Sequence, residues 1–343
     1  MRPTLQQELE ANLKTPDGKK AFSTWLRHFD ALADENARVR YSEYRERLKT
    51  FLGHIVGNKY KPWIPIGAIS QQAKAISIKC QGRKVATAYF QRNNSNFMIS
   101  FTKFAKDANP ENESAIVETP KVPYRETLTR LRDLPQLPKF RAGVDNYPEW
   151  ALEAWLAEQL AMRKKSEPTF EDKTPVDYSK MLLQVSSPFS ASKTEGNGVK
   201  IAPKANGHSD ILIRLKKGPS SWLGILELKA GDGKVNISKA LCQAFAYTYC
   251  YFHAFRNLPQ NSPERAKVLS VLGYVNPKWS KNGPPLGAIA VVPIKFGDDV
   301  IAEATERGLF DSALVREKQI GLFLWEYEPK RDGGYRFNEI RKI

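Results

Sequence analysis

The sequence predicts an α/β protein of two domains, the larger of which is a mixed sheet flanked by helices. Three observations favour this class. The 343 residues suffice for two domains of ordinary size, and 41% hydrophobic with 26% charged residues suits a chain that buries a core. Apolar runs with strand and helix periodicity alternate along the second half. A stretch rich in proline separates the two halves.

These patterns divide the chain into three parts. We expect a smaller basic α+β recognition or docking domain over residues 1–106, a proline-rich linker over 107–140, and the larger α/β domain over 141–343. Apolar residues at helical spacing predict helices over about the first 55 positions. A small antiparallel meander should follow, with strands at Ala75–Cys80, Lys84–Phe90 and Phe97–Phe104.

The charge of the first domain is distributed unevenly. The chain has 53 Lys and Arg against 37 Asp and Glu, a net charge of +16, and no acid occurs between Arg47 and Lys106. A field of this sign attracts polyanions, of which nucleic acid is the commonest. We expect the phosphate-contacting bases to be Lys59, Lys61, Lys74, Lys79, Arg83, Lys84 and Arg92. The alternative is a basic protein without a nucleic-acid partner.

The second domain alternates helices and strands. A helix at Glu149–Arg163 precedes a short strand at Met181–Val185 and a polar loop at Ser186–Asn206. Next come the hairpin strands Ser209–Leu215 and Trp222–Lys229. The remaining elements are a helix from Ser238 to about Phe255, strands Val268–Val275 and Leu286–Ile294, a helix at Asp298–Arg307, and a closing hairpin of Leu322–Tyr327 with Tyr335–Ile340.

Charged residues gather at the end of the apolar hairpin. Strand side chains alternate between faces, so Glu227 and Lys229 share one face, and Asp210 can face them from the neighbouring strand. Burying three charges is costly unless a metal or partner ions offset them. Two carboxylates and the Leu228 carbonyl form a hard oxygen site suited to Mg²⁺ or Mn²⁺. A lysine beside such a site can orient or deprotonate a water molecule.

Three motifs occur in order on strand, strand and helix. They are Gly207–Asp210 as G-x-x-D, Glu227–Lys229 as E-x-K, and Gln243–Tyr247 as Q-x-x-x-Y. An isolated E-x-K is a weak signal, because a Glu and a Lys at a strand end are usually a solvated pair. Together the motifs resemble the PD-(D/E)XK nuclease superfamily, in its RecB-like branch, over about residues 145–295.

The resemblance implies a metal-dependent nuclease that hydrolyses DNA phosphodiester bonds, in defence, restriction or DNA processing. It implies that Asp210, Glu227 and the Leu228 carbonyl bind the metal and that Lys229 positions the attacking water. It assigns a helping role to a helix carboxylate, for which we select Glu153 with Glu149 in reserve; alternatively, both carboxylates only stabilise the helix N-terminus. Gln243 with Tyr247 would support the substrate or the lysine. The alternative function is a nucleic-acid-binding protein with an inactive nuclease-like fold.

The remaining expectations concern partners and compartment. We expect DNA rather than RNA as the partner, and a homodimer or a larger defence or processing complex. No apolar run approaches the length of a membrane span, and the N-terminus lacks the apolar segment of a signal peptide. The three cysteines have no metal-ligand spacing and suit reduced thiols. We therefore expect a cytoplasmic protein without a membrane partner.

Overall fold

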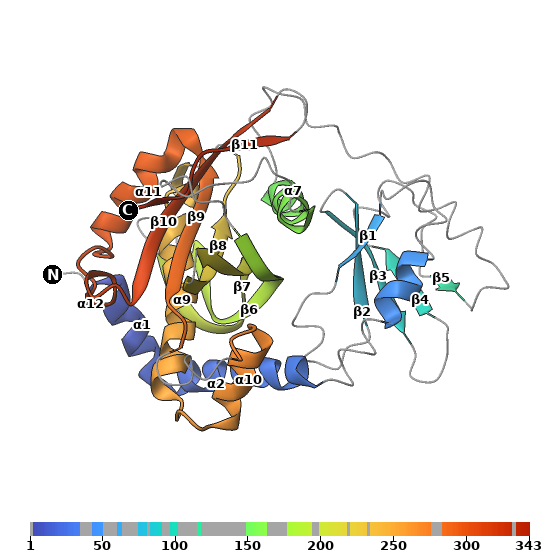
Figure 1. Cartoon of the computed structure of the whole chain (residues 1–343), viewed down its shortest axis with the longest axis horizontal. Coiled ribbons are helices and arrows are strands. Elements are labelled where there is room, and N and C mark those ends of the chain that lie inside the picture. The colour runs from blue at the N-terminus through green and yellow to red at the C-terminus, as the bar shows by residue number, and fades with distance from the viewer. Residues whose placement is uncertain are drawn as a thin grey trace. The chain divides into compact units, whose positions relative to one another are not determined.

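The computed structural model of the chain (Figure 1) forms two compact units. The larger unit combines Met1–Asp30 with Arg141–Ile343, and the inserted unit is Ala31–Phe140. The structure describes residues 3–34, 43–50, 60–63, 75–80, 83–90, 97–101, 115–117, 149–162, 177–193, 199–217, 220–231, 234–275, 283–330 and 334–343. The smaller unit therefore interrupts the sequence of the larger one.

The first thirty residues belong to the larger unit, whereas we expected them in the basic domain. They form helices α1 (Leu5–Lys14) and α2 (Pro16–Ala33). Trp25 and Phe29 of α2 are buried and meet the ring of Tyr251 edge-on, with centroids 5.1 and 6.4 Å away. Tyr251 lies on α9 (Ala240–Asn257) of the larger unit. The apolar spacing correctly predicted helices, but it carried no information about which core they join.

Polar contacts also hold these helices. Leu5, at the start of α1, donates its N–H to the carbonyl of Arg307 at 3.1 Å. The Arg307 guanidinium, 1% exposed, pairs with Glu8 at 2.6 Å. An exposed pair between Lys267 and Asp30, at 2.7 Å, joins the far end of α2. Helix α1 and α2 as far as Asp30 are thus part of the larger unit.

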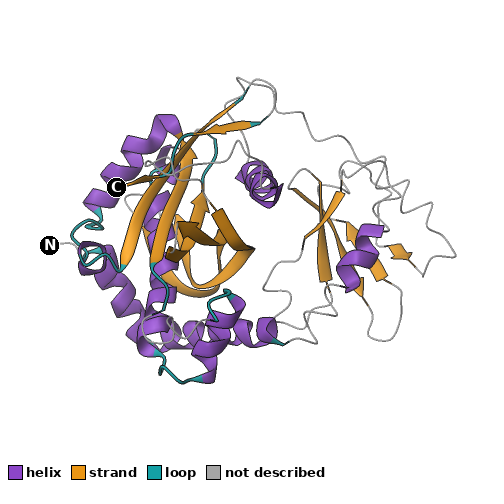
Figure 2. Ribbon diagram, viewed as in Figure 1, coloured by secondary structure: helices purple, strands orange, loops and turns teal. Residues whose placement is uncertain are grey.

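A mixed sheet forms the centre of the larger unit, which confirms the α/β class (Figure 2). Its order is β11-β10-β9-β8-β7-β6, and a short β12 also pairs with β10. The β8–β9 and β9–β10 pairs are parallel and the others antiparallel. The strands are β6 (Asp177–Lys193), β7 (Val199–Lys217), β8 (Ser220–Leu228), β9 (Leu286–Pro293), β10 (Ile320–Pro329), β11 (Tyr335–Phe337) and β12 (Arg341–Lys342).

Helix α9 is the central helix of the unit. It contacts five strands of the sheet and also α1 and α11 (Gly297–Glu306), so it lies between the sheet and an outer layer of helices (Figure 1). Most of its residues are buried, which explains why it is apolar on every side. The other helical elements are α7 (Glu149–Met162), α8 (Lys234–Ile237), α10 (Pro263–Val271), α12 (Ala313–Arg316) and the 3₁₀ turn η2 (Ile294–Phe296).

Two predicted segments differ in the structure. The polar loop predicted at Ser186–Asn206 is wrong, because β6 and β7 continue through it and pair as far as Lys193 with Val199. Backbone hydrogen bonds hold this ladder, so polar side chains do not prevent it. The strand predicted at Val268–Val275 is also wrong, because Ser262 caps a helix with Pro263 in its first turn.

The start of α9 also differs from the prediction. We expected Ser238 to be the N-cap, whereas α9 begins at Ala240 after the short α8, with Lys239 in the cap position. Cys242 and Cys250 on α9 are buried free thiols. Within the part of the chain that the structure describes, no helix is long and apolar enough to cross a membrane.

The inserted unit contains an antiparallel sheet of five strands in the order β1-β2-β3-β4-β5. A helix covers residues 43–50, with Tyr44 and Leu48 buried. Residues 115–117 form β5 and pair with β4, so part of the predicted linker belongs to this sheet. The other residues of 107–140 lie outside the described ranges. The strands are β1 (Tyr60–Trp63), β2 (Ala75–Cys80), β3 (Arg83–Phe90), β4 (Phe97–Phe101) and β5 (Ala115–Val117).

Candidate active site

The register of β7 and β8 brings Asp210 and Glu227 together. Leu212 pairs with Ile225 and Ile211 with Leu226, so one further step sets Asp210 opposite Glu227. Side chains at directly opposite positions lie on one face of a sheet. Because β8 ends at Leu228, both carboxylates lie where the ladder stops. The alternation of side chains along the two strands had predicted that Asp210 and Glu227 face each other.

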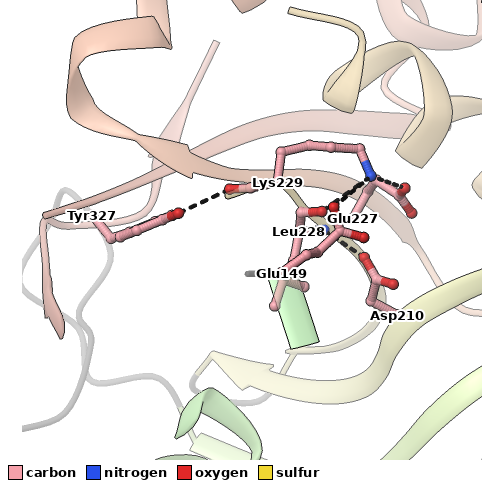
Figure 3. Close-up of polar contacts among 6 residues, drawn as sticks. All are labelled: Glu149, Asp210, Glu227, Leu228, Lys229 and Tyr327. Carbon is pink, nitrogen blue, oxygen red and sulfur yellow. Dashed lines mark hydrogen bonds and ion pairs between the residues drawn. The ribbon is translucent and has the colours of Figure 1, made fainter. Parts of the chain in front are cut away.

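Several oxygen and nitrogen groups meet at this point (Figure 3). Leu228 donates its N–H to Asp210 Oδ2 at 2.7 Å. The Lys229 ammonium donates to Glu227 Oε1 at 2.7 Å, to the Leu228 carbonyl at 3.1 Å and to Glu149 Oε2 at 3.4 Å. Two carboxylates and a carbonyl therefore already converge on one positive charge.

The backbone of Lys229 is held from two neighbouring strands. Its N–H donates to the carbonyl of Val291 on β9 at 2.9 Å. Its carbonyl accepts a hydrogen bond from the hydroxyl of Tyr327 on β10, also at 2.9 Å. Sequence reasoning missed Tyr327, which is 98 positions from Lys229. The strand pattern of β10 predicts an inward tyrosine but not the partner of its hydroxyl.

Burial shapes the charges of the cluster. Glu227 is 4% exposed, and burial raises its pKa to about 7, although the Lys229 ammonium acts in the opposite direction. Burial also raises the pKa of Asp210, and the Glu227 charge adds to the effect. Burial alone would lower the pKa of Lys229, but the surrounding carboxylates outweigh it and raise that pKa. The lysine therefore stays charged among acids that resist ionisation.

Helix α7 contributes both carboxylates considered from the sequence. Glu149 is its first residue, has a side chain 44% exposed, and forms the 3.4 Å ion pair with Lys229. Glu153, one turn later, is 4% exposed, and its charge helps to raise the pKa of Glu227. Glu149 thus contacts the lysine directly, and Glu153 acts electrostatically on the buried carboxylate.

The two residues of the third motif lie on α9, which contacts β8 and β9. Tyr247 is 5% exposed and Gln243 is partly buried. Gln243 is in the first turn of the helix, where its N–H bonds to the carbonyl of Lys239 at 3.0 Å. Residues four apart on a helix share a face, so the two side chains project in the same direction.

The donor set suits a hard divalent cation. Asp210, Glu227 and the Leu228 carbonyl offer oxygen atoms. Glu227 and this carbonyl accept from the lysine ammonium, and Asp210 accepts from the Leu228 N–H. Glu227 Oε2 is buried and makes no hydrogen bond with the described residues, which leaves it available as a ligand. No group of three or more His, Cys, Asp or Glu in the described ranges is arranged to hold a metal. The expected set has two carboxylates and a carbonyl.

Three of the predicted phosphate-binding lysines are neighbours in the inserted unit. Lys61 of β1 pairs with Lys79 of β2, and Lys79 pairs with Lys84 of β3. Like charges directly opposite each other destabilise a sheet unless a counter-charge is near. Arg83 begins β3 and pairs with Cys80. The other three predicted bases, Lys59, Lys74 and Arg92, lie outside the described residues.

Comparisons of the chain with models of protein families, with curated proteins and with solved structures found no match. The residues and their geometry therefore carry the functional argument by themselves.

Proposed function

We propose that this protein is a Mg²⁺- or Mn²⁺-dependent nuclease of the PD-(D/E)XK superfamily that hydrolyses DNA phosphodiester bonds. The observation that carries the proposal is the convergence of Asp210, Glu227 and Lys229 at one strand end. All three groups lie in a desolvated environment that shifts their pKa values. Perturbed ionisable groups of this kind are typical of active sites.

Each residue has a distinct role in the proposal. Asp210, Glu227 and the Leu228 carbonyl would hold the metal, which supplies positive charge to the phosphoryl oxygens and acidifies a bound water. Lys229 would orient that water, because its ammonium is held beside Glu227 at 2.7 Å. Glu149 and Glu153 would tune the charge of the lysine and of Glu227. Gln243 and Tyr247 would support the substrate or the lysine.

The carboxylates create an environment that favours a cation. The charges of Glu149 and Glu153 add to the raised pKa of Glu227, and Lys229 is the base that pairs with Glu227 and Glu149. Placing like charges together in a desolvated site is unfavourable. A divalent cation relieves this repulsion, so a stable fold with these residues favours metal binding.

The inserted unit would supply affinity for DNA. Lys61, Lys79 and Lys84 occupy paired backbone positions on three strands, with a register shift between Ile78 and Lys79, and we call them the lysine row. Lysines in such a row can each contact a phosphate, and phosphate contacts position a protein on nucleic acid without reading its sequence. The larger unit would then carry the chemistry and the inserted unit the docking surface.

The test is a cleavage assay with the full chain on linear and circular DNA and on RNA, with Mg²⁺ or with excess chelator. We expect DNA cleavage with Mg²⁺ and none with chelator. Asp210→Asn and Lys229→Met should abolish cleavage. The control Lys267→Met changes an exposed lysine that is not part of the site, and it should retain cleavage. Cleavage that persists in chelator would contradict the proposal. Tight DNA binding without any cleavage would instead favour the inactive, nucleic-acid-binding alternative.

A further inference from the structure

Tyr327 holds the backbone at the centre of the site without belonging to any of the three motifs. Its hydroxyl donates to the Lys229 carbonyl at 2.9 Å (Figure 3). We propose that Tyr327 is a positioning residue, which fixes the direction of the Lys229 side chain and the orientation of the oxygen site beside it. The inference rests on the proposed function and adds a residue to it.

Two peptide planes flank the Lys229 Cα, and each is held by a hydrogen bond. The plane before it contains the Leu228 carbonyl and the Lys229 N–H, and it is fixed by the 2.9 Å bond to Val291. The plane after it contains the Lys229 carbonyl, and Tyr327 fixes it. With both planes held, the direction of the Cα–Cβ bond is determined. The ammonium then reaches Glu227 from a defined starting point.

This support is needed because β8 ends at Leu228. The Lys229 N–H still bonds to Val291, and beyond that bond the regular ladder no longer constrains the chain. The Tyr327 hydroxyl acts as a substitute ladder partner for one more carbonyl. Without it, the plane that follows Lys229 could rotate, and the lysine ammonium would be displaced from Glu227.

Tyr327 itself is firmly held. It is 2% exposed, and burial raises its pKa, so the hydroxyl stays protonated and remains a donor. Its ring lies edge-on to Tyr335, with centroids 5.4 Å apart, and 5.6 Å from the ring of Phe337. The ring therefore cannot swing away without disrupting this packing.

The same packing reaches the helix that carries the carboxylates. Trp155 of α7 stacks on Phe337 with centroids 5.7 Å apart and planes 13° from parallel. Trp155 also meets Tyr335 edge-on at 5.3 Å. One aromatic cluster thus supports Tyr327 and α7, whose Glu149 pairs with Lys229. The same aromatic cluster therefore helps to position both Lys229 and Glu149.

The test compares Tyr327→Phe with Tyr251→Phe in the full-length protein. Tyr251 is a suitable control because its hydroxyl is also buried and makes no hydrogen bond with the described residues. Three quantities are measured: hydrogen exchange of the Lys229 amide, affinity for Mn²⁺ in the absence of DNA, and kcat and KM for DNA cleavage with Mg²⁺. Thermal unfolding confirms that both variants are folded.

For Tyr327→Phe we expect exchange at Lys229 to be about tenfold faster, because one buried hydrogen bond that supports the strand end is lost. We expect kcat or Mn²⁺ affinity to fall by about 10- to 100-fold, as for loss of an outer partner of a metal site. KM for DNA should change by less than about twofold, and Tyr251→Phe should match wild type. A merely structural role would not separate kcat from KM in this way.

Unchanged exchange at Lys229 would overturn the inference, and so would faster exchange with wild-type kcat and wild-type Mn²⁺ affinity. If the wild-type protein cleaves no DNA, the proposed nuclease function fails, and exchange with Mn²⁺ affinity alone decides the role of Tyr327. The two failures are therefore distinguishable.

Discussion

At the scale of single residues, Glu227 gives the clearest support for the proposed cation site. Its carboxylate is 4% exposed, and one oxygen has no hydrogen bond with the described residues. The Lys229 ammonium, at 2.7 Å, offsets the ionised form. A structure built for stability alone would place an apolar side chain here. The arrangement is therefore a cost of folding that a bound metal would recover.

This cost predicts how stability depends on pH in metal-free protein. The pKa of Glu227 is about 7 in the folded state and near 4.5 in the unfolded chain. A raised folded pKa means that the folded state binds the proton more tightly, so stability should be greatest below about pH 4.5. It should fall as pH rises through about 7. Asp210, whose pKa is also raised, contributes in the same direction.

Glu227→Gln should therefore flatten this dependence on pH, because glutamine does not titrate. Urea unfolding at pH 5 and pH 8, both in excess chelator, measures it. Glu317→Gln, a change at an exposed surface position, provides the control. If wild type and Glu227→Gln lose the same stability between the two pH values, the pKa of Glu227 is not raised.

At the scale of elements, the local sequence pattern predicted helices and strands, but it did not predict the long-range contacts between them. The hairpin of Asp210 and Glu227 was predictable because its two strands are close in sequence and alternate clearly. The helix-like spacing around Trp25 was equally clear, but its attachment to α9 depends on residues more than two hundred positions away. The polar continuation of β6 and β7 was missed because its ladder is made by the backbone. The Tyr327 contact was missed because it joins residues of different strands that are 98 positions apart in the sequence.

The attachment of α1 gives a prediction about stability. Glu8→Ala would leave the Arg307 guanidinium, 1% exposed, without its carboxylate. Loss of one partner of a buried pair costs about 3–5 kcal/mol, and we expect the lower end because Glu8 is 26% exposed. Asp30→Ala removes the exposed pair with Lys267 and should leave stability unchanged within error. Equal losses of unfolding free energy in both variants would mean that α1 is not anchored through Arg307.

At the scale of the whole molecule, the proposed function assigns docking to the inserted unit and chemistry to the larger one. Residues 1–30 and 141–343 share one core, so a fragment starting near residue 141 would expose the surface that α1 and α2 cover. We expect that fragment to aggregate or unfold. A chain in which a flexible Gly/Ser linker replaces residues 31–140 should fold and bind Mn²⁺. A well-folded 141–343 fragment, judged by circular dichroism and thermal unfolding, would contradict this division.

The lysine row predicts a salt effect. Duplex binding loses about 0.9 units of logarithmic salt slope for each phosphate contact removed. Lys79→Gln with Lys84→Gln should therefore lower the magnitude of that slope by about two units and weaken binding. Equilibrium binding at several salt concentrations, in chelator to prevent cutting, measures it. Lys267→Gln, outside the inserted unit, should keep the wild-type slope, and an unchanged slope in the double variant would place the docking surface elsewhere.

The central claim is that buried carboxylates at the end of the hairpin perform metal-dependent phosphodiester hydrolysis. The single-turnover rate of DNA cleavage at saturating Mg²⁺, for wild type, Glu227→Gln and the control Glu317→Gln, tests it most directly. We predict that Glu227→Gln loses more than about 100-fold, beyond the loss caused by removing an outer partner of a metal site, while the control cleaves as wild type does. A Glu227→Gln protein that cleaves DNA at the wild-type rate would contradict the account.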